Sequence, residues 1–310
     1  MTSPVLIVGS VALDSVETPF GKLDRAIGGA GTYSSFAASL LAPVRLVGVI
    51  GDDFPQSALD MLARRGVDLE GVKRIAGGMS FHWAGKYEYD MSSAETLKTE
   101  LNVFEQFDPR LPDSYRDSPY VFLANIQPGL QLSVLDQIDS PRLVVCDTMN
   151  YWIESARDEL LQVLSRVDLA LMNDAEARQL TGTPNLAKAA DQVLSLGPRY
   201  VVIKKGEYGA SLVSEKGHFS LPCYPLPQVT DPTGAGDSFA GGLVGFVAWL
   251  GASTEEALRQ AMACGTVLAS ACVQDFSLEG LKALGVSDLY DRYRQLREMV
   301  QFRDLPPAEG

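Results

Sequence analysis

The sequence is poor in the residues from which metal centres, disulfides and membrane spans are built. It has 2 histidines, which excludes a histidine-rich metal centre, and any Ser-His-Asp triad would have to use His82 or His218. The 4 cysteines show no C-x-x-C spacing and lie in or beside apolar segments, so we expect free, buried thiols. No apolar run approaches the roughly 20 residues of a transmembrane helix.

Basic residues are scarce as well. Lysine and arginine total 26 against 39 aspartates and glutamates, which gives a formal net charge of -13. Such a charge repels nucleic acids and anionic membranes, so we expect neither as a partner. No basic segment precedes the apolar residues of MTSPVLIVGS, and we expect a cytoplasmic protein. Any phosphate ligand of this acidic chain must therefore be held by local dipoles.

Short β-branched runs alternate with segments of helical periodicity along most of the chain. The runs predict buried strands over residues 4–9, 44–51, 120–125, 142–147, 167–173 and 200–206. Apolar residues at helical spacing predict helices between and after these strands, within 32–42, 54–66, 130–138, 156–166, 186–197, 254–271 and 286–301. A repeated strand–helix pattern favours an α/β fold in which helices flank a central, mostly parallel sheet.

Two early segments depart from this rhythm. Residues 14–27 and 72–90 alternate with the two-residue period of half-exposed strands. Because they interrupt the strand–helix pattern, we expect them to form a small sheet that projects from the main one. Neither an internal repeat nor a low-complexity linker divides the rest of the chain.

The most informative motif is DPTGAGDSFAGG, residues 231–242. Gly234 and Gly236 lack side chains, and the apolar residues that follow repeat at helical spacing, so the loop opens a helix. The first N–H groups of a helix have no intrahelical partner and lie at the positive end of its dipole, where a phosphate can approach closely. Asp231 and Asp237 place carboxylates beside this anion site, which suggests a proton acceptor next to a transferring phosphoryl group. The alternative is a glycine-rich turn with a polar helix cap.

The same motif resembles the signature of the ribokinase-like (PfkB) carbohydrate and nucleoside kinases. Further motifs of that family occur here in matching order and spacing: Gly9 and Asp14 in VGSVALD, Gly28 and Gly29 in IGGAG, NDAE over 173–176 and IKKGEYGA over 203–210. The resemblance covers nearly the whole chain. It implies ATP with Mg²⁺, phosphorylation of a primary alcohol, and one ribokinase-like domain over 1–303 whose small β lid is formed by the two alternating segments. Residues 304–310 are expected to be a frayed tail.

The resemblance also implies roles for individual residues. Asp237 becomes the base for the acceptor hydroxyl, and the N–H groups of Gly234, Ala235 and Gly236 form the anion hole. Asn173 and Glu176 order Mg²⁺ through its waters. The other matched positions divide between the two substrates, with Asp14, Gly28 and Gly29 at the acceptor and Lys205, Gly206 and Gly209 beside ATP. A monovalent cation near Asp231 is left open.

Several of these roles have structural alternatives. Asn173 could be an ordinary helix N-cap with Glu176 as its capping-box partner. Asp14 could be a turn residue after the first strand. Lys204 or Lys205 could equally be a solvated surface lysine.

One position departs from the family pattern. These kinases commonly carry an asparagine a few residues after the glycine pair, where it contacts the acceptor, and this chain has Tyr33 there. A tyrosine can stack on a flat ring or offer one hydroxyl. The lid segment adds the aromatic side chains of Phe81, His82, Trp83 and Tyr87. The acceptor is therefore open between a sugar, a polyol and a nucleoside, and the lid aromatics could instead pack within the lid or at a homodimer seam. A phosphorylated sugar ranks below these because the lid offers only scattered basic residues.

Two other function classes are alternatives to a kinase. A dinucleotide-dependent oxidoreductase would share the strand–helix pattern, but VGSVAL after the first strand lacks G-x-G-x-x-G, and no P-loop lysine motif occurs. A non-catalytic sugar-binding protein on the same fold is harder to dismiss because fold does not establish activity. Asp237 within a full glycine loop favours catalysis. The sequence thus predicts an ATP-dependent kinase for a small sugar or sugar-like alcohol, with a nucleoside kinase as the alternative.

Overall fold

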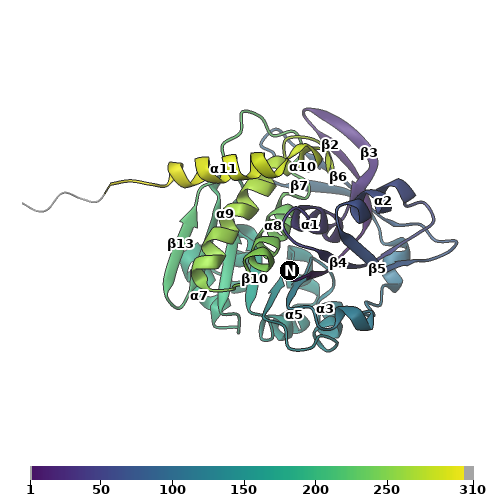
Figure 1. Ribbon diagram of the computed structural model, residues 1–310, viewed down its shortest axis with the longest axis horizontal. Helices are drawn as coiled ribbons and strands as arrows, with labels where there is room; N and C mark the ends of the chain where they lie inside the picture. The colour runs from purple at the N-terminus through teal and green to yellow at the C-terminus, as the bar shows by residue number, and fades with distance from the viewer. Residues whose placement is uncertain (1, 304–310) are drawn as a thin grey trace, which may run out of the picture.

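The structure, a computed structural model, describes residues 2–303, whose strands form two sheets (Figure 1). The large sheet has nine strands in the order β13-β12-β11-β10-β9-β8-β1-β4-β5. They are β1 (Val5–Val8), β4 (Val44–Ile50), β5 (Val67–Arg74), β8 (Tyr120–Leu123), β9 (Leu143–Cys146), β10 (Leu169–Asn173), β11 (Tyr200–Lys204), β12 (Ala210–Ser214) and β13 (Gly217–Leu221). All neighbours pair in parallel except β11–β12 and β12–β13. The predicted α/β fold class and each predicted buried strand are confirmed.

Helices cover both faces of the large sheet. One face packs against α1 (Ala30–Ala38), α2 (Gln56–Arg64), α8 (Ala235–Leu250), α9 (Glu255–Cys272), α10 (Glu279–Ala283) and α11 (Val286–Met299). The other packs against α3 (Pro128–Leu135), α4 (Asn150–Ser155), α5 (Arg157–Leu164), α6 (Asp174–Thr181) and α7 (Leu186–Leu194). In α8, for example, Phe239, Leu243 and Val247 recur every four residues, and all three are buried in the core.

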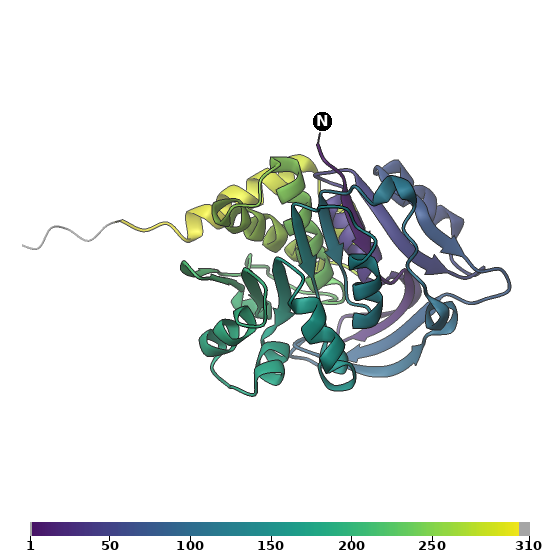
Figure 2. The ribbon, with the colours of Figure 1, turned by 90° about the horizontal axis from the view of Figure 1, so that it is seen from below.

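A second sheet contains most of the two alternating segments together with β7, which was not predicted, and we call it the lid; its strand order is β3-β2-β6-β7. Its strands are β2 (Ala12–Thr18), β3 (Gly21–Gly28), β6 (Phe81–Tyr87) and β7 (Ala94–Glu100). Figure 2 shows these purple and blue strands standing apart from the large sheet, on the side toward which β1 runs from the N-terminus. The expectation for 72–90 needs a correction: residues 72–74 pair with β4 and end β5 of the large sheet. Polar and apolar residues alternate in a half-exposed edge strand as they do in a lid strand, so the sequence pattern alone could not assign residues 72–74 to the correct sheet.

The topology directs several polar side chains to one edge of the large sheet. Strand β1 lies between β8 and β4, so successive strands run outward from it on both sides, which marks the point where α/β sheets of this kind bind ligands. Asp147 follows β9, Asn173 ends β10 and Lys204 ends β11. Because the carboxyl ends of parallel strands meet at the same edge, these residues lie on the side of the lid.

Three smaller expectations concern cysteines, membranes and the tail. Cys146, Cys264 and Cys272 are free and buried as expected, whereas the free Cys223 is half-buried. None of the described helices is both long and apolar enough to cross a membrane. The predicted frayed tail, 304–310, lies outside the described residues.

Candidate active site

Helix α8 begins with a turn that leaves part of its N-terminus bare. Gly234 is the N-cap, with a φ of 76° that favours glycine, and no side chain caps the helix. The N–H of Ala235, expected in the anion hole, donates to the carbonyl of Pro232 over 3.2 Å. The N–H groups of Gly234 and Gly236 have no hydrogen-bond partner among the described residues. These two groups lie at the positive end of a long helix and can bind an anion.

Tyr33 of α1 lies directly against this turn. Its side chain is 2% exposed, and a Cβ atom at Gly234 would lie 2.4 Å from Cδ1 of the ring. Only glycine fits at such a distance. Burial raises the pKa of Tyr33 well above its ordinary value. The ring therefore supports the glycine turn, so the face that meets Gly234 is not free to stack on an acceptor.

Asp237, in the first turn of α8, is half-buried among other carboxylates. Burial and the charge of Asp147 raise the pKa of Asp237 to about 7, against the opposing charge of Lys204. Burial also raises the pKa of Asp14 to about 7, and the charges of Asp237 and Asp231 add to this effect while the N–H of Gly29 opposes it. A carboxylate whose pKa lies near neutrality is well matched to accept a proton.

Asp14 lies at a second helix N-terminus, that of α1. Its Oδ2 accepts the N–H of Gly29 over 3.3 Å, and a Cβ atom at Gly28 would lie 1.9 Å from the same oxygen. The side chain of Ser10 accepts the next N–H, that of Ala30, over 3.0 Å. The N-terminus of α1 is therefore already occupied by protein groups, in contrast to that of α8.

The lid reaches the same carboxylates through Tyr87 of β6. Thr233 Oγ1 donates to the Tyr87 hydroxyl over 3.3 Å. Burial raises the pKa of Tyr87 to about 12, and the charges of Asp231, Asp14 and Asp237 contribute to the rise. Tyr87 thus brings the lid into contact with the loop that opens α8, beside the acidic cluster. Another lid aromatic, Trp83, packs within the lid, where a Cβ atom at Gly85 would lie 2.2 Å from its ring.

Asn173 and Glu176 form the capping box of α6, the structural alternative noted from the sequence. Asn173 Oδ1 accepts the N–H of Glu176 over 2.8 Å, and Glu176 Oε2 accepts the N–H of Asn173 over 2.6 Å. Burial raises the pKa of Glu176 to about 7, against the charge of Lys204. Among the described residues, no group of three or more His, Cys, Asp or Glu side chains is arranged to hold a metal.

An ion pair between Lys204 and Asp147 is the main feature that the sequence analysis missed. Lys204 Nζ lies 2.7 Å from Asp147 Oδ2, and a Cβ atom at Gly236 would lie 3.2 Å from the same Nζ. The pair therefore borders the start of α8. An acid at the end of the buried run LVVCD was the available signal for Asp147.

The neighbouring Lys205, which was expected beside ATP, points elsewhere. Its Nζ donates to Ser211 Oγ over 2.9 Å. Gly206 and Gly209 have φ of 56° and 85° and form the turn between β11 and β12. No atom lies within 4 Å of a Cβ built at Gly206, so the backbone of this turn is open on one side.

His82 lies in a hydrogen-bond chain of the lid. Its Nε2 is 3.0 Å from Ser15 Oγ, and its Nδ1 is 2.9 Å from Glu100 Oε2. This order of atoms is that of a Ser-His-acid triad, but the Ser15 hydroxyl donates to Asp24 over 2.5 Å. Its proton is therefore not directed at His82, and the arrangement does not support a serine nucleophile.

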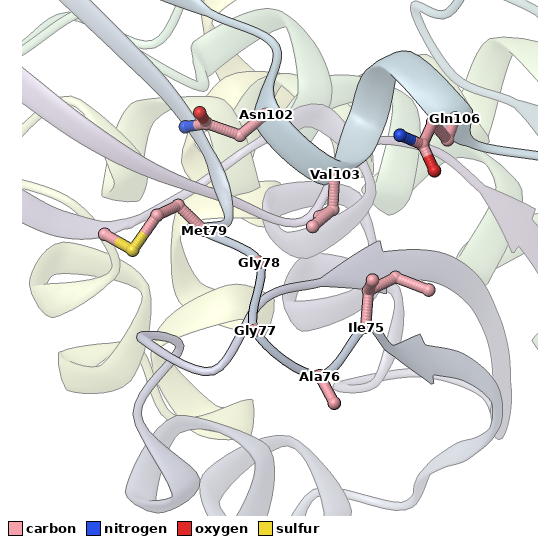
Figure 3. A pocket seen from close by; sticks show the side chains of 8 residues that line it. All are labelled: Ile75, Ala76, Gly77, Gly78, Met79, Asn102, Val103 and Gln106. Carbon is pink, nitrogen blue, oxygen red and sulfur yellow. The ribbon is translucent and has the colours of Figure 1, made fainter.

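A cavity of about 310 Å³ lies where the chain enters and leaves the lid. It is lined by residues 75–79, Asn102, Val103 and Gln106 (Figure 3). None of these residues has an ionisable side chain. The groups suited to acid–base and anion chemistry lie instead at the start of α8, which is therefore the candidate active site.

Two sequence comparisons identify the family. Residues 133–277 match the model of the pfkB family carbohydrate kinases. The chain is 32% identical over 246 residues to a cytidine kinase of Thermococcus kodakarensis, and the alignment covers 77% of this chain and 87% of that protein. The chain belongs to the pfkB family of carbohydrate kinases. The resemblance that the motifs indicated is confirmed, and the protein is a kinase for a carbohydrate or a nucleoside.

Solved structures share the fold of this pfkB kinase. The nucleoside kinase of Burkholderia thailandensis in complex with inosine matches with a TM-score of 0.76 and 21% identity over 94% of this chain and 97% of its own. The ribokinase of Arabidopsis thaliana complexed with ribose and ATP matches with a TM-score of 0.74 and 21% identity over 95% of this chain and 99% of its own.

Glu176→Gln separates the capping role from a role at Mg²⁺. Glutamine can keep the two hydrogen bonds of the capping box but cannot also accept from Asn173 Nδ2, as Glu176 Oε1 does over 2.7 Å, so the free energy of unfolding in urea should fall by about 1 kcal/mol. The substitution removes the negative charge that favours Mg²⁺ and its waters, so the Mg²⁺ concentration for half-maximal rate should rise severalfold. Initial rates over a Mg²⁺ titration measure this. An unchanged Mg²⁺ dependence would leave Glu176 as a capping residue only.

Proposed function

We propose that this kinase transfers the γ-phosphoryl group of ATP to a primary alcohol of a nucleoside, with Asp237 as the base. The observation that carries the proposal is a half-buried carboxylate in the first turn of a helix whose Gly234 and Gly236 N–H groups have no partner among the described residues. An anion hole and a proton acceptor side by side serve the two halves of a phosphoryl transfer. Tyr87 closes over both and helps to exclude water, a competing acceptor.

The glycine turns fit the polyphosphate of ATP. The N–H groups of Gly234 and Gly236 have no partner among the described residues and can donate to phosphate oxygens, while the absence of side chains lets the Tyr33 ring and the Lys204 ammonium group pack against the turn. The open backbone at Gly206 suits the nucleotide side of the same edge. Asn173 and Glu176 would hold Mg²⁺ through its waters, because each accepting oxygen keeps a second lone pair. When bound, Mg²⁺ neutralises charge on the phosphate oxygens.

In the reaction, Asp237 binds the acceptor hydroxyl and takes its proton. Phosphoryl transfer passes through a loose transition state, so the base mainly orients the hydroxyl in line and accepts the proton late. The N–H groups of Gly234 and Gly236 donate to oxygens of the transferring phosphoryl group. On the acceptor side, Asp14 is fixed by the Gly29 N–H and accepts hydrogen bonds from neighbouring hydroxyls.

The choice of a nucleoside rests on the relatives and on the lid. The sequence analysis placed a sugar first, but the cytidine kinase matches 77% of this chain at 32% identity, which supports a nucleoside. Tyr87 brings an aromatic ring to the site, and such a ring can stack on a base. A free sugar is the second candidate because the Arabidopsis ribokinase, which shares the fold, is complexed with ribose.

Two accessory expectations stay predictions. Asp231 accepts the N–H groups of Thr233 over 2.9 Å and Ser277 over 3.4 Å, so a monovalent cation there would complete an already ordered loop. Rates with and without K⁺ test this.

A homodimer through the lid would cover Phe20 and Leu97, which are 51% and 55% exposed. Sedimentation equilibrium of wild type and Leu97→Glu tests the dimer.

A substrate screen tests the proposed function. Purified protein is incubated with ATP and Mg²⁺ against nucleosides, free sugars and polyols, and phosphorylated products are detected by mass spectrometry. We expect a nucleoside 5′-monophosphate as the main product. Phosphorylation of free sugars alone would replace the nucleoside by the second candidate. Binding of ATP without product from any acceptor would contradict the proposed kinase reaction.

Asp237→Asn tests the base. The substitution preserves the shape of the side chain but removes the charge and the proton acceptor, so kcat should fall about 100-fold or more. The Kd values for ATP and acceptor should change little, because the proton is transferred only in the reaction. Product formation and calorimetry measure these quantities, with Asp60→Asn, an exposed aspartate of α2, as the control. Near-full turnover of the Asp237 variant would reduce Asp237 to a helix-terminal residue.

The pH dependence follows from the raised pKa of Asp237. With a pKa of about 7, the carboxyl group is protonated below neutrality and cannot act as the base. The acceptor kcat/KM should therefore fall as pH decreases through this value, about tenfold per unit where one group controls it. Asp14 titrates in the same range, and the two steps separate by comparison with Asp14→Asn. A profile that stays flat down to about pH 5 would mean that Asp237 titrates as an ordinary carboxylate.

A further inference from the structure

An ion pair joins the lid to the rest of the protein. Arg25 of β3 pairs with Asp53, which lies in the loop between β4 and α2. The two side chains are 37% and 16% exposed. Of the ion pairs among the described residues, this is the one that links a lid strand to a residue outside the lid. The other charged pairs of the lid, such as Lys22 with Glu17, stay within it.

Asp53 also holds the point where the chain enters the lid. Its Oδ1 accepts the N–H of Ser80 over 2.7 Å and the Ser80 hydroxyl over 2.8 Å, while its Oδ2 accepts from Arg25. Ser80 is fully buried and directly precedes β6. One carboxylate therefore binds the edge strand β3 and the start of β6 at the same time.

The backbone at Arg25 is unusual for an arginine. The pairing of β2 with β3 shifts at this place, so that Asp24 and Arg25 together lie opposite Ser15 in a β-bulge. Arg25 has a φ of 49°, in the left-handed region that favours glycine. A side chain in this region costs conformational free energy and persists only where other contacts compensate for it. The ion pair with Asp53 is such a contact, and glycine at this position could not form it.

The position of β3 matters for the acceptor side of the active site. Ala26, the residue after Arg25, is the partner of Asp14 in the pairing of β2 with β3. The strand then leads into Gly29, whose N–H donates to Asp14 Oδ2. A movement of β3 away from the loop of Asp53 would therefore carry Asp14 with it.

We propose that Arg25 is a positioning residue for the acceptor, because its ion pair with Asp53 holds the lid against the large sheet and its helices. With the lid held in this way, Asp14 stays beside Asp237. This inference rests on the proposed function, in which Asp14 binds acceptor hydroxyls. Arg25 acts through the lid and not through a contact with substrate. A half-exposed ion pair is weak, which suits a contact that must break to admit the acceptor and release the product.

Arg25→Gln tests the role in the reaction. The substitution removes the charge, so the lid opens more easily and the acceptor KM should rise about two- to fivefold. The kcat and the KM for ATP should change little, because the groups that act on the phosphoryl group are intact. Lys22→Gln removes a cation of the same strand whose partner, Glu17, lies within the lid, and should change none of these quantities. Arg25→Lys keeps the charge and should have an acceptor KM between those of the wild type and Arg25→Gln.

Two further measurements separate the ion pair from a purely structural role. Salt screens a half-exposed pair, so the acceptor KM of the wild type should approach that of Arg25→Gln as NaCl is raised to about 1 M. Arg25→Gly relieves the left-handed backbone but loses the ion pair. Its acceptor KM should rise as in Arg25→Gln while its melting temperature changes little. A lower melting temperature with an unchanged acceptor KM would leave Arg25 with a structural role only and overturn the proposal.

The position of the lid can be measured without any substrate. Spin labels on Tyr89→Cys, in the turn between β6 and β7, and on Tyr151→Cys of α4 report the distance between the lid and the rest of the protein, because both positions are exposed. Cys223→Ser removes the half-buried native thiol. Arg25→Gln should broaden the distance distribution measured by double electron–electron resonance, whereas Lys22→Gln should not. A distribution that Arg25→Gln leaves unchanged would overturn the proposal.

Failure of this proposal and failure of the proposed function are distinguishable. A wild-type protein that phosphorylates no acceptor would contradict the proposed function, while the spin-label distances would still test the ion pair. An acceptor KM that Arg25→Gln leaves unchanged, or that Lys22→Gln raises equally, would contradict the role of Arg25 and leave the kinase reaction in place.

Discussion

Helices α1 and α8 approach each other so closely that glycine is required at their contacts, and the active site depends on this approach. A Cβ atom at Gly241 would lie 2.2 Å from the carbonyl oxygen of Ser34, and one at Gly234 would lie 2.4 Å from the Tyr33 ring. Because α1 begins beside Asp14 and α8 begins beside Asp237, the same packing brings the two carboxylates together. A larger residue at these glycines would separate the helices and move the carboxylates apart.

Bringing the carboxyl groups of Asp14 and Asp237 together makes their ionised forms less favourable. Asp14 and Asp237 have pKa values raised to about 7, so the folded protein disfavours their ionised forms. The stability that their protonated forms contribute is fully present below the ordinary carboxyl pKa, about 4, and is lost as pH rises through about 7. The ionised form that the proposed base requires is thus less stable than the protonated one. The bare N–H groups of α8 are the proposed phosphate site, and they lie beside these acids.

The sequence predicted the parts of the fold that local patterns encode. The buried strands were recognisable as short β-branched runs, and the turn at Gly234 was recognisable from the glycines and the helical periodicity after them. The division of residues 72–90 between two sheets could not be recognised, because polar and apolar residues alternate in the same way in an edge strand of the large sheet and in a strand of the lid. The same limit applied to the site. Tyr33 was expected at the acceptor, yet its ring meets Gly234. Lys204 and Asp147 pair although they are 57 residues apart in the sequence, and no local pattern reveals such a pairing.

The most direct test of the central claim is a crystal structure with ADP, Mg²⁺, a nucleoside and aluminium fluoride, which mimics the transferring phosphoryl group. The account predicts that the fluoride ligands lie within hydrogen-bond distance of the Gly234 and Gly236 N–H groups and that the acceptor hydroxyl contacts Asp237. A mimic bound away from the start of α8, or an acceptor hydroxyl that meets a different base, would contradict it.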